Sequence, residues 1–444
     1  MPKKKFKEHY TLYNLFTCLS LAGIVGFFLF ALIRGSFAFD WVSMRNKGGI
    51  HTIDYFNHVL LAAYPEYIYE IATGIWGMFP PLAYVFYRFL FLITYDGADL
   101  PQSYAQLAAM NYTQTVFLYY SLFVALLLVF AIEAWRKENA HYKRLVACLL
   151  LSVPFFAGGF ERGNSVMVVV PLLLIALKWK DSGSRLKKEL ALVIIAICAG
   201  LKIYPAIFGL LYIKEQRFKE GFRLLGYGIL FFFVPFLFFG GKNGLILWLL
   251  NVIETTGTES LGRLEYIKGL TCTLGYLITG RDLPLLGAIM TNLFLLAMIG
   301  LFVVSVDKYR TVFYLCCCMT FFPVNAHRYT LSYLAIPLVM YLMEHGSERG
   351  KDAFITAEIV GYGCLFSIPV LWGFLTGFRL QVADINPHLT YVELWLYVAA
   401  YSVVLTTAAH ELYRVIEKKE LNPTLKLEIT RRRVSGKTDA EIQK

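Results

Sequence analysis

The feature that most constrains this chain is its series of long apolar runs, several of which reach the roughly 20 residues that a helix needs to cross a bilayer. Hydrophobic residues make up 57% of the 444 residues and charged residues only 16%. A soluble domain would carry about 25% charged residues. We therefore predict an all-α, polytopic integral membrane protein.

The first apolar run, residues 12–33, follows the basic segment Lys3-Lys4-Lys5-Phe6-Lys7 and ends at Arg34-Gly35 without a small-x-small cleavage site. It is too long for a signal peptide, so we interpret it as an uncleaved first span. Basic residues cluster in short loops, and the positive-inside rule then puts both termini in the cytoplasm. The same rule accounts for the net charge of +11. We expect contact with membrane lipid and no binding of nucleic acid.

The topology that follows has about 12 membrane segments. An external loop, residues 35–112, contains a short apolar stretch, residues 79–95, with Arg88 in its middle, which we interpret as an interfacial or re-entrant helix. Residues 190–213 lie between two basic loops and contain Pro205, so we predict two short helices whose turn dips outward. The other expected spans are residues 113–135, 145–160, 165–177, 224–240, 285–306, 311–325, 329–343, 354–377 and 391–413.

Two domains are expected from this pattern. Residues 1–415 form the transmembrane domain, and residues 416–444 form a basic cytoplasmic tail that contains Arg431-Arg432-Arg433. Eight cysteines show no CxxC spacing, and Cys316-Cys317-Cys318 lie in an apolar helix, where they are expected to pack. We predict neither a metal nor a cofactor.

Four polar clusters lie at or near the ends of the apolar runs, and the expected topology puts all four on the outer side of the membrane. A charge held at a membrane boundary is costly, so converging charges there indicate a functional site. The clusters are Ile53-Asp54-Tyr55, Glu161-Arg162-Gly163-Asn164, Lys202-Ile203-Tyr204-Pro205 and Asn325-Ala326-His327-Arg328.

Two of the clusters supply a carboxylate, Asp54, and an arginine, Arg162, of the kind that pairs with carboxylates. Asp54 is ionised at neutral pH and suits a general base toward a hydroxyl, or else it caps a helix over residues 55–64. Arg162, with Asn164, offers a planar fork for a phosphate or a carboxylate, or else it pairs with Glu161 at the surface.

The other two clusters are cationic. Lys202 sits in an apolar stretch beside the predicted break, where it either reaches the interface or neutralises an anion in a cavity. His327 and Arg328 at a helix end suit a pocket for a departing phosphate, although a single interfacial histidine is more often structural. One carboxylate with several cations suits transfer from a lipid phosphate to a hydroxyl. The sequence has no Gly-rich phosphate loop, so a soluble nucleotide donor is not expected.

In these motifs the chain resembles the polytopic membrane glycosyltransferases of the type C fold, most closely family 87, whose type members are polyprenyl-phosphomannose-dependent mannosyltransferases. The resemblance spans nearly the whole chain to about residue 413. It rests on Asp54 in the first external loop, Phe79-Pro80-Pro81-Leu82-Ala83-Tyr84, Arg162-Gly163-Asn164, Lys202-Ile203-Tyr204-Pro205 and Phe322-Pro323-Val324-Asn325-Ala326-His327-Arg328-Tyr329.

The resemblance implies roles for these residues. Asp54 would be the base of an inverting transfer, His327 and Lys202 would face the donor phosphate, and Arg162 and Arg328 would assist. Asn164, Tyr204 and His58 complete the residues expected to bind donor or substrate. Many family members have Gln in the Arg162 region and Lys-Pro in place of Lys-x-Tyr-Pro. Some type C enzymes use a divalent metal, but the family most resembled does not need one, and Asp40, Glu66 and Glu70 receive no role.

The expected function is therefore transfer of a hexose from a polyprenyl-phosphate donor to a lipid-linked or cell-envelope glycan on the outer face of the plasma membrane. The resemblance implies that this hexose is mannose. The alternative is a lipid-linked glycan flippase or transporter that uses the same cationic cavity. No internal repeat and no chain of buried acids for proton coupling is visible in the sequence, which favours the enzyme.

Overall fold

The structure is a computed structural model, and it describes residues 11–34, 53–70, 77–95, 97, 100–136, 142–152, 159, 162–256, 261–323, 327–346, 352–376 and 391–417. These residues form helices and turns, and no strand occurs among them. The all-α prediction is confirmed for this part of the chain. Asp40 and Glu161 lie outside the described residues, as do Asn325, Ala326 and the tail beyond residue 417.

Four helices in the described part of the chain are long and apolar enough to cross a membrane. Their outward-facing side chains are apolar, as lipid contact requires; Leu285 and Leu296, for example, are 75% and 67% exposed. The expected count of about 12 membrane segments and the type C fold remain predictions. The four candidate spans lie in α1 (Leu12–Arg34), α6 (Asn111–Ala134), α12 (Phe218–Phe233) with η5 (Val234–Phe238), and α15 (Pro284–Val304).

The remaining helices differ widely in length. Two long helices near the C-terminus are α18 (Ala353–Thr376) and α19 (Tyr391–Ile416). The others are α3 (Ile53–Ala63), α4 (Pro81–Thr94), α5 (Tyr104–Ala109), α7 (Tyr142–Leu150), α9 (Val166–Trp179), α10 (Arg185–Leu201), η4 (Tyr204–Phe208), α11 (Gly209–Lys214), α13 (Gly241–Thr256), α14 (Ile267–Thr279), α16 (Lys308–Phe321), η6 (Arg328–Leu334) and α17 (Ala335–His345).

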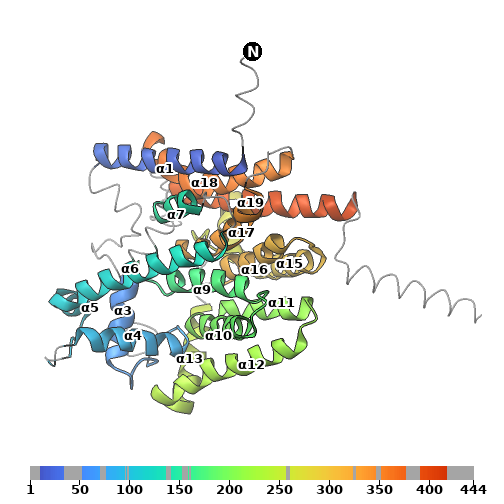
Figure 1. The fold of residues 1–444 in the computed structure, drawn as a ribbon. Helices are drawn as coiled ribbons and strands as arrows, with labels where there is room; N and C mark the ends of the chain where they lie inside the picture. Colours follow the sequence, from blue (N-terminus) through green and yellow to red (C-terminus); the bar gives the residue numbers. More distant parts are fainter. Residues whose placement is uncertain are drawn as a thin grey trace, which may run out of the picture.

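The long helices run roughly parallel across the view in Figure 1, with α3, α4 and α5 gathered at one side of the bundle. Helix α1 packs on α18, and α18 packs on α19. A second series of neighbours runs from α6 to α9, from α9 to α10 and from α10 to α12, while α14 and α15 form a hairpin. Buried residues of α9, α16, η6 and α17 form the centre of the core.

The predicted break in residues 190–213 is present. Helix α10 ends at Leu201, and the chain continues as the short 3-10 helix η4, which has Pro205 in its first turn, and then as α11. Gly200 lets α10 approach its neighbours closely at this point, because a Cβ there would lie 2.7 Å from Leu82 Cδ2 and 3.0 Å from the Phe231 carbonyl oxygen. The break directs Lys202 away from the helix that precedes it.

Other expected elements differ in their bounds. Helix α12 begins at Phe218 rather than at residue 224, because an amphipathic turn with Lys219 and Arg223 extends the apolar run. The described part of the expected span 145–160 is α7, which has only 9 residues. Helix α4 has 14 residues, or about 21 Å, which is short for a span. The Arg88 guanidinium caps α3 by donating to the carbonyls of Ala62 and Ala63, at 2.9 and 2.8 Å.

A buried ionic cluster that the sequence analysis missed joins α16, α18 and α19. The Arg310 side chain is 1% exposed and donates to Glu411 Oε2 at 3.1 Å and to Glu358 Oε1 at 3.2 Å. His410 Nδ1 lies 3.1 Å from Glu358 Oε1. Cys316, Cys317 and Cys318 follow on the same helix and are buried free thiols, as their expected packing role requires.

Replacing Arg310 by Met is expected to destabilise the protein by about 3–5 kcal/mol, because Glu358 and Glu411 would stay buried without their counter-charge. The measurement is thermal unfolding of the purified protein in detergent. Arg223 is the matched control, because its pair with Glu189 is 44% and 28% exposed, and Arg223→Met should cost at most about 1 kcal/mol. Equal losses in the two variants would contradict the prediction.

Candidate active site

Asp54 forms the centre of the site, because two of the predicted clusters meet at its carboxylate. It is the second residue of α3. Arg162 donates to it through Nε and Nη2, at 3.0 Å to Oδ2 and 2.5 Å to Oδ1, and Asn164 Nδ2 donates to Oδ2 at 2.9 Å. The sequence left open whether the planar fork of Arg162 binds a phosphate, a carboxylate or Glu161. In the structure the fork binds the carboxylate of Asp54.

The turn that carries Arg162 and Asn164 is held rigidly at the start of α9. Gly163 has φ +63°, and a Cβ there would lie 2.7 Å from Tyr55 Cβ, so only glycine fits this close approach. Tyr87 donates its hydroxyl hydrogen to the Gly163 carbonyl at 3.3 Å, and Tyr120 donates to the Asn164 carbonyl at 3.1 Å. The Arg162-Gly163-Asn164 sequence thus holds the donors of Arg162 and Asn164 in fixed positions at the Asp54 carboxylate.

The surroundings of Asp54 keep it ionised. Burial alone would raise the pKa of Asp54, but the charge and hydrogen bonds of Arg162 and the hydrogen bond of Asn164 outweigh burial and lower the pKa to about 2. A carboxylate has about four lone-pair sites. Three hydrogen bonds from Arg162 and Asn164 leave about one site for a substrate hydroxyl.

His58 lies one helical turn after Asp54 and is packed among aromatic rings. Its ring centroid lies 4.0 Å from that of Phe79 and 5.2 Å from that of Tyr87. Burial lowers the pKa of His58 to about 3, and its Nδ1 atom is buried with no hydrogen-bond partner among the residues that the structure describes. His58 is therefore a neutral ring that packs against Phe79 and Tyr87, one helical turn from Asp54.

Lys202, directly after α10, is 8% exposed and lies over an aromatic face. Its Nζ is 3.6 Å from the centroid of the Phe79 ring and 5.9 Å from that of Tyr329. A desolvated cation over a ring is stabilised by about 2 kcal/mol. Burial lowers the pKa of Lys202 to about 7, and the negative charge of Asp54 acts in the opposite direction. A bound anion would raise this pKa and favour the charged form of the amine.

Lys202 lines a cavity of about 620 Å3. Among the described residues that line it there are two lysines and no carboxylate, so the cavity suits an anion. Its walls come from the segment that precedes α4, the break between α10 and η4, η4 itself, α13, α14, α15 and the segments around Phe322 and His327. The lining residues are Met78, Phe79, Pro80, Lys202, Ile203, Tyr204, Trp248, Val252, Lys268, Ala288, Thr291, Asn292, Phe322, Pro323, His327 and Tyr329.

His327 lies between α16 and η6, where its carbonyl accepts from the Thr330 amide and hydroxyl, each at 2.8 Å. Burial lowers the pKa of His327 to about 3, and the charges of Arg263 and Arg162 act in the same direction. The imidazole is therefore neutral and offers a hydrogen bond rather than a charge. Arg328 is half-buried at the start of η6 and does not line the cavity.

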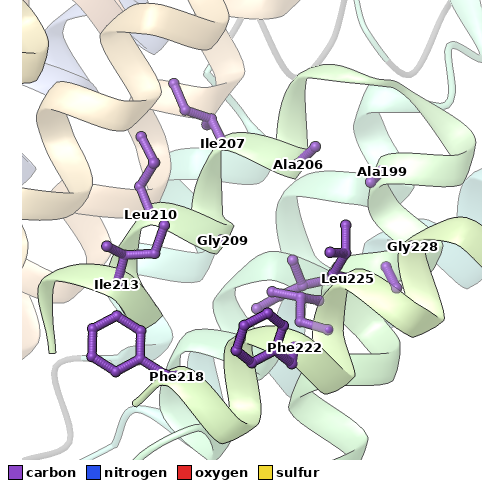
Figure 2. A pocket seen from close by; sticks show the side chains of 14 residues that line it. Ala199, Ala206, Ile207, Gly209, Leu210, Ile213, Phe218, Phe222, Leu225 and Gly228 are labelled. Carbon is purple, nitrogen blue, oxygen red and sulfur yellow. The ribbon is translucent and has the colours of Figure 1, made fainter. Parts of the chain in front are cut away.

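A separate groove of about 610 Å3 lies on the other part of η4 (Figure 2). Tyr204 lines the polar cavity, whereas Ala206 and Ile207 line the groove. All 14 lining side chains are apolar or glycine, and they come from α10, η4, α11 and α12. A polar cavity and an apolar groove therefore share one short helix.

The structure thus groups the predicted residues into two neighbouring sets. Asp54, Arg162 and Asn164 are in direct contact, and Lys202, Tyr204 and His327 line the cavity. Sequence reasoning missed Lys268, Trp248 and Asn292, because no expected motif contains them. Glu66 is exposed and Glu70 half-buried beyond the end of α3. Within the described ranges, no group of three or more His, Cys, Asp or Glu side chains is placed to hold a metal ion, and the predicted independence from metal remains a prediction.

Comparison with known proteins gives one match. The sequence model of glycosyltransferase family 87 matches residues 103–325, which is half of the chain. This segment contains Arg162, Asn164, Lys202 and Tyr204, whereas Asp54 and His327 lie outside it. No curated protein and no solved structure matches the chain.

The lowered pKa of Asp54 gives a testable pH dependence of stability. Its ordinary value is 3.8 and its folded value is about 2, so the ion pair contributes fully above about pH 4 and its contribution is lost as pH falls toward 2. The loss should be about 2 kcal/mol. Thermal unfolding followed against pH in detergent should show a smaller acid loss in Asp54→Asn than in wild type. Glu66→Gln, an exposed control on the same loop, should behave as wild type, and equal slopes in all three proteins would argue against the pair.

Proposed function

The chain belongs to glycosyltransferase family 87, and from this premise we propose that it transfers a hexose from a polyprenyl-phosphate donor with inversion of configuration. We propose mannose as the sugar and a lipid-linked or cell-envelope glycan as the acceptor. The protein is a membrane glycosyltransferase with an all-helical described structure. The observation that carries the proposal is the ionised carboxylate of Asp54, which interacts electrostatically with Lys202. Lys202 lines a cavity whose described lining residues include two lysines and no acid.

The cavity supports a phosphate as the group that leaves. The Lys202 amine lies over the Phe79 and Tyr329 rings, and a bound phosphate would raise its pKa, which burial lowers to about 7. Neutral His327 would donate a hydrogen bond to a phosphate oxygen, and Tyr204 lines the same wall. Donors aimed at a developing negative charge in a dry site are the largest source of transition-state stabilisation in many enzymes.

The apolar groove supports a lipid rather than a soluble donor. It begins on η4 directly beside the residues that line the polar cavity, and it follows α11 and α12. Helix α12 with η5 is one of the candidate spans. A donor with a phosphate in the cavity and an isoprenoid chain along α11 and α12 would bury the polar and apolar parts of the same molecule in matching surroundings.

The proposed chemistry uses Asp54 as the base. The acceptor oxygen forms a bond to the anomeric carbon while the bond between that carbon and the phosphate oxygen breaks. The hydroxyl proton passes to Asp54, and the electron pair leaves with polyprenyl phosphate. A carboxylate with a pKa of about 2 is a weak base, so it accepts the proton late, when the attacking oxygen has become acidic.

Arg162 and Asn164 act in this scheme as positioning residues for Asp54, and His58 packs behind it. Arg328 is placed beside the cavity segment at His327, and we propose that it supports that segment. We further propose that the enzyme lies in the plasma membrane with about 12 segments in the type C fold. Both termini and the tail 416–444 would then be cytoplasmic, with the site at the outer face beside the loop 35–112.

The rate of transfer should fall by about 100-fold or more in Asp54→Asn, because an amide cannot accept the proton. The assay gives purified protein radiolabelled polyprenyl-phosphate mannose and a total membrane lipid extract, and it follows label in new glycolipid. Donor binding should persist in Asp54→Asn, and Glu66→Gln should transfer as wild type.

The other outcomes each exclude part of the proposal. Transfer by both wild type and Asp54→Asn would remove Asp54 as the base. Transfer by neither, repeated with glucose and galactose donors, would remove the polyprenyl-phosphate hexose. Movement of labelled donor across vesicles without formation of any product, retained in Asp54→Asn, would instead identify a lipid-linked glycan transporter.

A further inference from the structure

Lys268 stands out because its position is unfavourable for the helix that carries it. It is the second residue of α14, which runs from Ile267 to Thr279. The N-terminal end of a helix carries a partial positive charge, so a lysine in the first turn is electrostatically disfavoured. The stability of α14 therefore gives no reason for a cation here.

The surroundings of Lys268 direct it into the cavity that contains Lys202. Its side chain lines that cavity and is half-buried. The stem passes closely over Gly287 of α15, where a Cβ would lie 3.0 Å from Lys268 Cγ. The glycine thus leaves room for the stem to lie against α15.

The ammonium group of Lys268 also lacks a fixed counter-ion within the described ranges. No ion pair or hydrogen bond of its side chain occurs there, and the cavity lining contains no acid. Two other lysines are paired with a carboxylate: Lys180 Nζ lies 3.0 Å from Asp181 Oδ1, and Lys308 Nζ lies 2.9 Å from Asp181 Oδ2. Lys202 and Lys268 line the same cavity, so an anion bound between them would be attracted by both amines.

We propose that Lys268 is a second phosphate-binding residue, which contacts the donor phosphate from the α14–α15 wall while Lys202 contacts it from the wall formed by η4. This inference rests on the proposed function, because it assigns a residue to the donor of that reaction. Two cations on separate hairpins would fix the phosphate between them, whereas a single lysine is a point charge that leaves its orientation free. Lys268 thereby becomes a determinant of donor recognition that lies outside the motifs of the sequence.

The experiment measures equilibrium binding of radiolabelled undecaprenyl phosphate to the purified full-length protein in nanodiscs. Undecaprenol, which has the same chain without the phosphate, is the uncharged probe. Lys268→Met should weaken binding of the phosphate by about tenfold or more and leave undecaprenol unchanged. Lys268→Arg should keep most of the affinity. Lys242→Met, an exposed lysine on α13 outside the cavity lining, should bind as wild type.

The contrary outcomes separate this inference from the function on which it rests. Unchanged phosphate binding in Lys268→Met, together with a loss in Lys202→Met, would overturn the role of Lys268 and leave the proposed function standing. An equal loss in Lys268→Arg and Lys268→Met, or a parallel loss of undecaprenol, would show a packing effect and would also overturn it. If wild type binds the phosphate no better than the alcohol, both the inference and the proposed donor fail.

Discussion

The ion pair between Asp54 and Arg162 is the contact on which the site depends. It joins residues 108 positions apart in the chain, so it fixes α3 against the turn that begins α9. Burying two charges is costly unless they are paired and their remaining hydrogen-bonding sites are filled. Asn164 supplies one further donor, and the position of the Asp54 carboxylate relative to Lys202 and the cavity follows from this arrangement.

Much of the fold was predictable because lipid limits the possible structures. The apolar runs predicted helices, and Pro205 predicted the break after α10. The order of the motifs predicted the family. Partners were not predictable, since a sequence shows which residues are charged but not which charges meet. Arg162 was expected at the phosphate and lies on Asp54, while Arg88, expected within an interfacial helix, caps α3. Lys268 and the Arg310 cluster gave no local signal, because each depends on helices distant in the chain.

Helix α16 connects the Arg310 cluster with the segment that contains His327. Arg310, in its first turn, is held by α18 and α19. After Phe321, where the helix ends, the chain leads to His327 and the cavity. The 14 residues of α16 span about 21 Å, and every one of them after Lys308 is buried. The ionic cluster therefore fixes the first turn of α16 against α18 and α19, and the chain beyond the last turn of α16 leads to His327.

The acid-free lining of the cavity has a consequence for turnover. A sugar phosphodiester carries one negative charge, whereas the monoester that remains after transfer carries about 1.5–2 near neutral pH. If the donor is the proposed polyprenyl-phosphate sugar, a cavity whose described lining has lysines and no carboxylate would attract the spent carrier more strongly than the loaded one. Retention of the used lipid would then oppose the next cycle, and the pace of the enzyme would depend on how quickly the surrounding membrane removes and reloads that carrier.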